Sequence, residues 1–158
     1  MKPFNIVLIE PEIPPNTGNI ARLCAATGTV LHLVGPLGFS LDDRYLKRAG
    51  LDYWEFVSLK RWLDLETLQA AAAAAAAEGR FFYLSTKVKR SYLDAGFQPG
   101  DYIVFGKETR GLPEELLAAN PETSFTIPMP SDKVRSLNLS TSVGIVLYEA
   151  LRQCGGLG

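Results

Sequence analysis

The sequence has few of the residues on which metal and hydrolytic sites depend. Its 158 residues include two cysteines, Cys24 and Cys154, and a single histidine, His32. The cysteines lack metal-ligand spacing, so in a protein that is not secreted we expect free thiols. His32 lies within an apolar strand pattern, and a catalytic triad or a metal site needs partners that the sequence does not supply. We therefore expect a structural histidine and no bound metal.

Long apolar runs and an excess of one charge are also missing. No apolar stretch approaches the length that spans a bilayer. The first apolar segment is too short for a signal peptide and has no small-residue cleavage site after it, so we expect a cytoplasmic protein without membrane contact. The net charge of −1 weighs mildly against a nucleic-acid partner. It does not exclude one, because a local basic patch can coexist with a neutral total.

Two common nucleotide-binding motifs are absent as well. The chain has neither a Walker phosphate loop nor a dinucleotide fingerprint.

Its length and its ordinary hydrophobic content of 47% predict one globular domain, residues 1–158.

Short apolar runs alternate with helical patterns along the chain. The runs predict strands at residues 5–9, 30–34, 54–57, 81–84, 102–105 and 125–127. Helices are expected from about residue 19 to 27, at 41–49, at 63–78 (which includes eight consecutive alanines), from Pro113, and at 139–151. The alternation indicates an α/β fold, a mainly parallel sheet with flanking helices.

Three polar segments follow strands, where ligands collect in parallel α/β folds. The first is Asn16-Thr17-Gly18-Asn19-Ile20-Ala21-Arg22. It is either a helix start with Asn16 or Thr17 as N-cap and a solvated Arg22, or the mouth of a site where the Arg22 guanidinium grips phosphate. Taken alone, the segment favours the helix start.

The second segment is Phe105-Gly106-Lys107-Glu108-Thr109-Arg110-Gly111-Leu112-Pro113. It is either a polar loop before a helix or a loop whose backbone wraps a ligand, since glycine permits close approach. The third joins Ile127-Pro128-Met129-Pro130 to Arg135-Ser136-Leu137-Asn138-Leu139-Ser140. It is either a long capped turn or a ligand site at the N-terminus of the last helix, where backbone amides are exposed.

Taken together, the three segments resemble the signature motifs of the SPOUT methyltransferases, in the family's order and over residues 6–151. Two stretches make the resemblance more specific, Glu10-Pro11-Glu12-Ile13-Pro14-Pro15-Asn16-Thr17-Gly18-Asn19 and Arg48-Ala49-Gly50-Leu51-Asp52-Tyr53. They are similar to the smallest subgroup, the tRNA 2′-O-methyltransferases that modify the wobble ribose.

The resemblance implies an enzyme that uses S-adenosylmethionine to methylate a ribose of RNA, most specifically the wobble nucleotide of tRNA. It also implies a C-terminal trefoil knot and a homodimer with active sites near the subunit interface. We expect the apolar stripe of the last helix to contact the partner. Methylation of another tRNA or rRNA ribose, or a non-catalytic RNA-binding module on the same scaffold, remains the alternative.

Site residues also follow from the resemblance. Arg22, Glu108 and Asn138 take the catalytic positions, and Arg22 matches the family's proposed catalytic arginine, acting as a base or as an electrostatic stabiliser. The residues implied to line the cofactor are Leu84, Gly106, Ile127, Met129, Ser136 and Leu137. Candidate RNA contacts are Asn16, Arg44, Lys47, Arg48, Lys87, Lys89 and Arg90.

Overall fold

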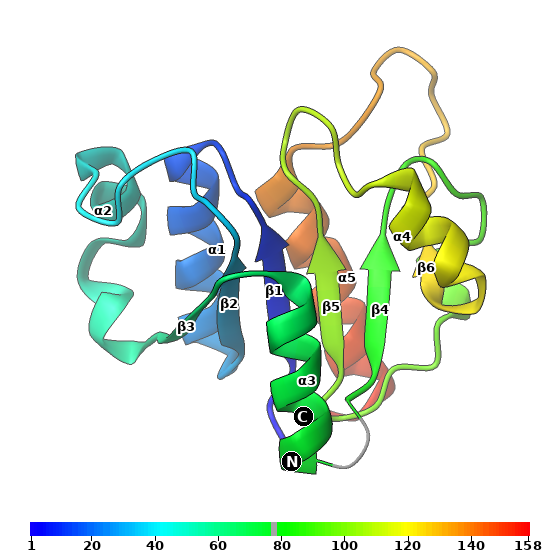
Figure 1. Ribbon diagram of the computed structural model, residues 1–158, viewed down its shortest axis with the longest axis horizontal. Helices are drawn as coiled ribbons and strands as arrows, with labels where there is room; N and C mark the ends of the chain where they lie inside the picture. Colours follow the sequence, from blue (N-terminus) through cyan, green and yellow to red (C-terminus); the bar gives the residue numbers. More distant parts are fainter. Residues whose placement is uncertain (77–78) are drawn as a thin grey trace.

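A six-stranded parallel sheet forms the centre of the protein (Figure 1). The computed structural model describes residues 1–76 and 79–158. The strand order is β3-β2-β1-β5-β4-β6, and every paired neighbour runs parallel. The strands are β1 (Asn5–Ile9), β2 (Val30–Val34), β3 (Ser58–Trp62), β4 (Phe81–Leu84), β5 (Tyr102–Phe105) and β6 (Ser124–Phe125). The predicted α/β fold with a mainly parallel sheet is confirmed.

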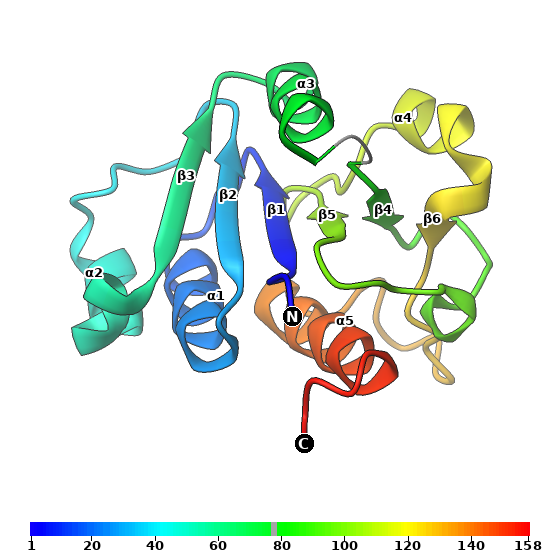
Figure 2. The same ribbon diagram turned by 90° about the horizontal axis from the view of Figure 1, so that it is seen from below.

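Helices cover both faces of this sheet. Figure 2 shows α1 and α5 on one face and α3 and α4 on the other, with α2 beside α1. The helices are α1 (Pro14–Thr27), α2 (Arg44–Gly50), α3 (Leu65–Ala76), α4 (Glu114–Ala119) and α5 (Leu139–Gln153). Of the helix expected at 63–78, Ala77 and Glu78 lie outside the described residues.

The core lies on both sides of the central strand β1. Ile6 and Leu8 point into a cluster that includes Val146 of α5, whereas Val7 points into a second cluster with Leu68 of α3. All three β1 side chains are fully buried. Burial on both faces is why this strand is apolar throughout instead of alternating.

Some predicted elements were misplaced. The strand expected at 54–57 is wrong, because Leu51–Phe56 forms a 3₁₀ helix and the edge strand is Ser58–Trp62. Ser58, Lys60 and Arg61 of that edge strand are exposed, so no apolar run marks it. Helix α1 begins at Pro14 instead of about residue 19, so neither Asn16 nor Thr17 is its N-cap. The last strand is shorter than expected and ends at Phe125.

The apolar stripe of α5 does not face a partner. Its residues are buried within this chain, and they are Val143, Val146, Leu147, Ala150 and Leu151. They pack in the same cluster as β1 and α1. The expectation that this stripe contacts a partner was therefore wrong.

His32 is structural, as expected. Its Nδ1 accepts a hydrogen bond from Nε1 of Trp62 at 2.9 Å, and its Nε2 lies 2.9 Å from Oδ1 of Asn5. Burial lowers the pKa of His32 to about 4, so the ring is neutral at pH 7. Cys24 and Cys154 are free, also as expected. Within residues 1–76 and 79–158, no helix is long and apolar enough to cross a membrane, and no cluster of metal-ligating side chains occurs.

Candidate active site

A cleft of about 800 Å³ opens at the carboxyl ends of β4 and β5, in the size range of small-molecule sites. The loops after these strands and the long segment before α5 rise above the sheet at this end (Figure 1). Three stretches line most of it: residues 84–87, 105–111 and 135–139. Asn16 of the first segment singled out in the sequence, residues 105–111 of the second, and Ile127, Met129 and residues 135–139 of the third all line it, so parts of the three segments meet at one place.

Gly106 is required by the chain itself. A Cβ at this position would lie 2.1 Å from the carbonyl carbon of Gly111 and 2.4 Å from the nitrogen of Leu112. Gly111 turns the loop back with a φ of 64° and bridges to Lys107. The returning backbone of the same loop fills the space that a side chain at this position would take, while Gly106 itself still lines the cleft.

Glu108 binds the start of α1. Its two carboxylate oxygens accept hydrogen bonds from the backbone nitrogens of Glu12 and Ile13, both at 2.8 Å. Backbone amides at a helix start lack intrahelical partners, and Pro14 has no N–H to offer. A carboxylate from a distant loop therefore caps α1, which explains how the helix begins at Pro14 without a side-chain cap of its own.

Asn16 connects this cap to α5. It is 6% exposed, and its Nδ2 donates to Glu108 at 3.2 Å while its Oδ1 accepts from Nδ2 of Asn138 at 3.0 Å. Asn138 is the N-cap of α5, where its Oδ1 accepts from the nitrogen and hydroxyl of Ser140. One continuous hydrogen-bonded chain thus joins all three segments.

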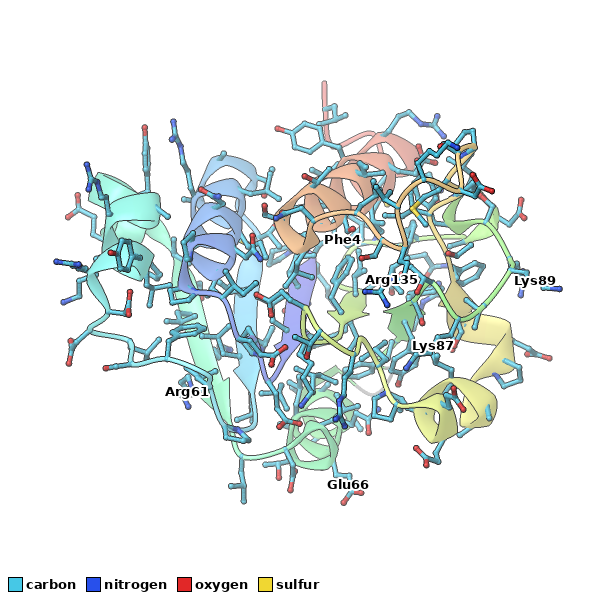
Figure 3. The ribbon with its side chains drawn as sticks, turned by 90° about the horizontal axis from the view of Figure 1, so that it is seen from above. Phe4, Arg61, Glu66, Lys87, Lys89 and Arg135 are labelled. Atoms are coloured by element: carbon cyan, nitrogen blue, oxygen red, sulfur yellow. The ribbon has the colours of Figure 1, made fainter. Side chains whose placement is uncertain are left out.

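The cleft is positively charged although the whole chain is not. Among the described residues that line it, the basic side chains are Lys87, Lys107, Arg110 and Arg135, and the acidic one is Glu108. Figure 3 shows Arg135 and Lys87 within the loop region, whereas Lys89 extends outward at the edge. Lys87 is fixed by a 2.8 Å hydrogen bond from its Nζ to the carbonyl oxygen of Leu112. This local basic patch suits an anionic ligand.

The cleft gathers the predicted cofactor residues and only part of the rest. It is lined by Leu84, Gly106, Ile127, Met129, Ser136 and Leu137, and also by Glu108, Asn138, Asn16 and Lys87. The residues outside it are Arg22, Arg44, Lys47, Arg48, Lys89 and Arg90.

Several of these outlying basic side chains already have partners. The Arg22 guanidinium lies 5.0 Å from the ring centre of Tyr53, and both residues are exposed. Arg90 lies over Phe125 and donates to the carbonyl oxygen of Glu122. Within one chain, therefore, Arg22 does not join Glu108 and Asn138.

Several contributors to the site were given no role from the sequence, and Arg135, Thr109 and Glu12 are examples. Arg135 lines the cleft and directly precedes Ser136, a neighbour that could have identified it. Thr109 also lines the cleft, and Glu12 binds it from outside. The Glu12 contact joins segments 97 residues apart, so no local pattern marks it.

Enzymes with an open α/β sheet bind their ligands in a cleft at the carboxyl ends of the strands. The cleft described above, built from loops and a helix N-terminus, is typical of that class. The chain belongs to the SpoU rRNA methylase family, whose model matches residues 3–148. It is 55% identical over 151 residues to a tRNA (cytidine(34)-2′-O)-methyltransferase of Methylovorus glucosotrophus, covering 95% of each chain. It is 52% identical to the Escherichia coli K12 protein of the same description, covering 96% of this chain and 94% of that one.

Solved structures agree with this assignment. One, described as structural insights into the 2-OH methylation of C/U34 on tRNA, is 47% identical with a TM-score of 0.88 and covers 96% of both chains. An AdoMet-bound rRNA methyltransferase from Sinorhizobium meliloti is 25% identical with a TM-score of 0.80, covering 95% of this chain and 56% of that one.

Proposed function

We propose that this protein transfers a methyl group from S-adenosylmethionine to the 2′-hydroxyl of the wobble nucleotide of tRNA. The observation that carries the proposal is the near-full-length identity to tRNA (cytidine(34)-2′-O)-methyltransferases, in a chain whose three matching segments meet in one cleft. The protein is an enzyme, and S-adenosylmethionine is its methyl donor.

The cleft residues suit this cofactor. Leu84, Ile127 and Leu137 give it apolar surface for an adenine ring, and its basic side chains can attract a carboxylate. Met129, Ser136 and the backbone of Gly106 complete the lining that would hold the cofactor. When bound, S-adenosylmethionine supplies a methyl group activated by its sulfonium charge.

The chain's own contribution is mainly positioning, which can supply much of the barrier reduction in a transfer reaction. Both oxygens of Glu108 are occupied by backbone amides, so Glu108 orients the cleft loop and is poorly placed to take a proton. Asn138 likewise holds Asn16 and the first turn of α5. These two residues fix the frame in which cofactor and ribose meet.

Arg22 acts on the reacting ribose from a second subunit in this proposal. Its exposed place on α1, outside its own cleft, supports a homodimer in which each cleft is completed by Arg22 of the partner subunit. A guanidinium stays protonated in proteins, so stabilising the developing alkoxide suits it better than accepting the proton.

RNA contacts extend outward from the cleft. Lys107, Arg110 and Arg135 join Lys87 at the cleft, and further phosphate contacts fall to Arg44, Lys47 and Arg48 on α2 and to Lys89 and Arg90. A wobble nucleotide lies in a loop and can be splayed into a pocket, unlike a nucleotide in an A-form helix.

The chain forms one domain with a C-terminal trefoil knot in this proposal. Support comes from Thr126, whose nitrogen donates to Arg90 at 2.7 Å and whose carbonyl accepts from Tyr92 at 2.8 Å. Ser85, at the other end of the same loop, bonds the adjacent Phe125 carbonyl at 3.0 Å. Residues 85–92 thus leave and return to the same short stretch, Phe125 and Thr126. A loop closed in this way is what a knot needs, because the chain must pass through a closed loop. A tRNA substrate supports a cytoplasmic location for the protein.

The test is to incubate purified protein and S-adenosylmethionine with total RNA from cells lacking it and to map new ribose methylation. Methylation at tRNA position 34 alone is expected. Methylation at another tRNA or rRNA ribose would replace the proposed target, and RNA binding without transfer would indicate a non-catalytic module.

A further inference from the structure

A second glutamate, Glu12, binds the cleft loop at Thr109, the residue after Glu108. Its Oε1 accepts hydrogen bonds from the backbone nitrogen of Thr109 at 3.0 Å and from the Thr109 hydroxyl at 2.7 Å. Its own backbone nitrogen donates to Glu108 at 2.8 Å. The two glutamates thus form a reciprocal clamp. The carboxylate of Glu108 binds the backbone of Glu12 and Ile13, and the carboxylate of Glu12 binds the backbone of Thr109, the residue after Glu108.

We propose that Glu12 is a positioning residue, which sets the shape of the 106–111 loop and thereby the affinity of the cleft for S-adenosylmethionine. The inference rests on the proposed function for the identity of the ligand. Glu12 lies outside the lining of the cleft, whereas its partner Thr109 belongs to it. Glu12 therefore acts through Thr109 and need not touch the cofactor.

The 106–111 loop depends on its contact with Glu12 because the ion pair between Lys107 and Glu10 is weak. Nζ of Lys107 lies 3.9 Å from Oε1 of Glu10, with the two side chains 32% and 41% exposed, and ion pairs this long and this open to solvent contribute little. The bridge between Lys107 and Gly111 closes the base of the loop and leaves residues 108–110 between them to be held by side chains. The bonds of Glu12 and Glu108 hold two of these residues, Glu108 and Thr109.

The charge around Glu12 favours the form that the clamp needs. The hydrogen bonds from Thr109 hold the pKa of Glu12 below its ordinary value, and the charges of Lys107 and Arg110 act in the same direction. The side chain is thus a carboxylate, and charge-assisted hydrogen bonds to carboxylates are stronger than neutral ones.

Calorimetry of cofactor binding tests the proposal. Glu12→Ala should raise the Kd for S-adenosylmethionine about tenfold, the effect expected for a lost charge-assisted hydrogen bond. Glu12→Gln should stay within about threefold of wild type, because an amide oxygen can accept the same two bonds. Glu10→Gln, which removes the charge of the neighbouring exposed pair, is the matched control and should leave the Kd unchanged.

Steady-state kinetics and thermal unfolding separate positioning from simple loss of stability. In Glu12→Ala the KM for S-adenosylmethionine should rise while kcat changes little, and Thr109→Val should give a smaller rise that is not additive in the double variant. A lowered Tm with wild-type Kd and KM would overturn the proposal and leave Glu12 a merely structural residue.

Hydrogen exchange of the Thr109 amide, measured by NMR without ligand, keeps this test independent of the proposed function. Exchange should be faster in Glu12→Ala than in wild type, and close to wild type in Glu12→Gln. If the wild-type protein bound no S-adenosylmethionine, the proposed function would fail and the exchange rate would still judge the clamp. Unchanged exchange in Glu12→Ala would overturn the clamp itself.

Discussion

Asn138 donates from its Nδ2 to Oδ1 of Asn16 at 3.0 Å, across 122 residues of sequence. The orientation of the Asn16 amide follows from its other end, because the carboxylate of Glu108 can only accept and so takes the Nδ2 group. Each of the three residues lies in a different one of the three segments singled out in the sequence. A change at Asn16 should therefore disturb the whole cleft.

Replacing Asn16 with aspartate tests this link. Asn16→Asp removes the donor to Glu108 and sets a buried carboxylate against the half-buried carboxylate of Glu108, so the free energy of unfolding should fall by about 2 kcal/mol. Methyl transfer should fall with it. Asn19→Asp, an exposed change on the same helix, should leave the denaturant midpoint unchanged. Equal midpoints for both variants would disprove the role given to Asn16.

The two loop glycines should differ sharply when changed to alanine. Gly106→Ala places a Cβ against backbone that has no room to move, so we expect no stably folded protein. Gly111→Ala meets no neighbour within 4 Å and bears only the strain of a positive φ, about 1–2 kcal/mol. Thermal unfolding of the purified variants compares them. A Gly106→Ala protein with the wild-type Tm would show that the backbone of Gly111 and Leu112 does not pack tightly against Gly106.

The sequence predicted the local elements well and the long-range contacts poorly. Residues 5–9 and 102–105 were readable as strands because both faces of a central strand are buried. Strand β3 was not, since its outer face is polar. The start of α1 was misplaced because its cap, Glu108, is 95 and 96 residues away in sequence from the two backbone nitrogens that it binds. The site residues were found through motif resemblance, whereas Glu12 acts through geometry that only the fold reveals.

Acid should destabilise the protein through His32. Its pKa is about 4 in the folded state against an ordinary value of 6.5, so the unfolded chain binds the proton first as the pH falls. Stability is fully present above pH 6.5 and is lost progressively from there down to pH 4, by about 3 kcal/mol at most.

Urea unfolding at several pH values measures this effect. His32→Gln keeps a donor and an acceptor for Asn5 and Trp62 but does not titrate, so it serves as the control. The difference in unfolding free energy between the two proteins should shrink or reverse from pH 7 to pH 4.5. Parallel pH profiles would show that His32 does not titrate on unfolding.

Arg22 should matter for transfer and not for cofactor binding. Arg22→Ala should bind S-adenosylmethionine with the wild-type Kd yet lose transfer by about a hundredfold or more, and Arg22→Lys should also be poor because lysine lacks the planar fork. Tyr53→Ala should cost a few-fold by freeing the guanidinium, whereas Tyr53→Phe keeps the ring beneath it. Near-normal turnover in both Arg22 variants would remove this residue from the reaction.

Mixed dimers test whether Arg22 serves the partner's cleft. Neither Arg22→Ala nor Asn138→Ala should be active alone. Co-expressed, they form a dimer in which one cleft has an intact Asn138 and an intact Arg22 of the partner subunit, so activity should return in part. If both residues serve the same chain's cleft, the mixed dimer stays inactive.

The central claim is that the 2′-hydroxyl of the wobble nucleotide accepts the methyl group. An anticodon stem-loop carrying a 2′-deoxy wobble nucleotide tests it most directly. The enzyme is incubated with labelled S-adenosylmethionine and either this stem-loop or its all-ribose counterpart, and methyl incorporation is counted. We predict incorporation into the all-ribose stem-loop and none above background into the deoxy one. Equal incorporation into both would contradict methylation of the wobble ribose.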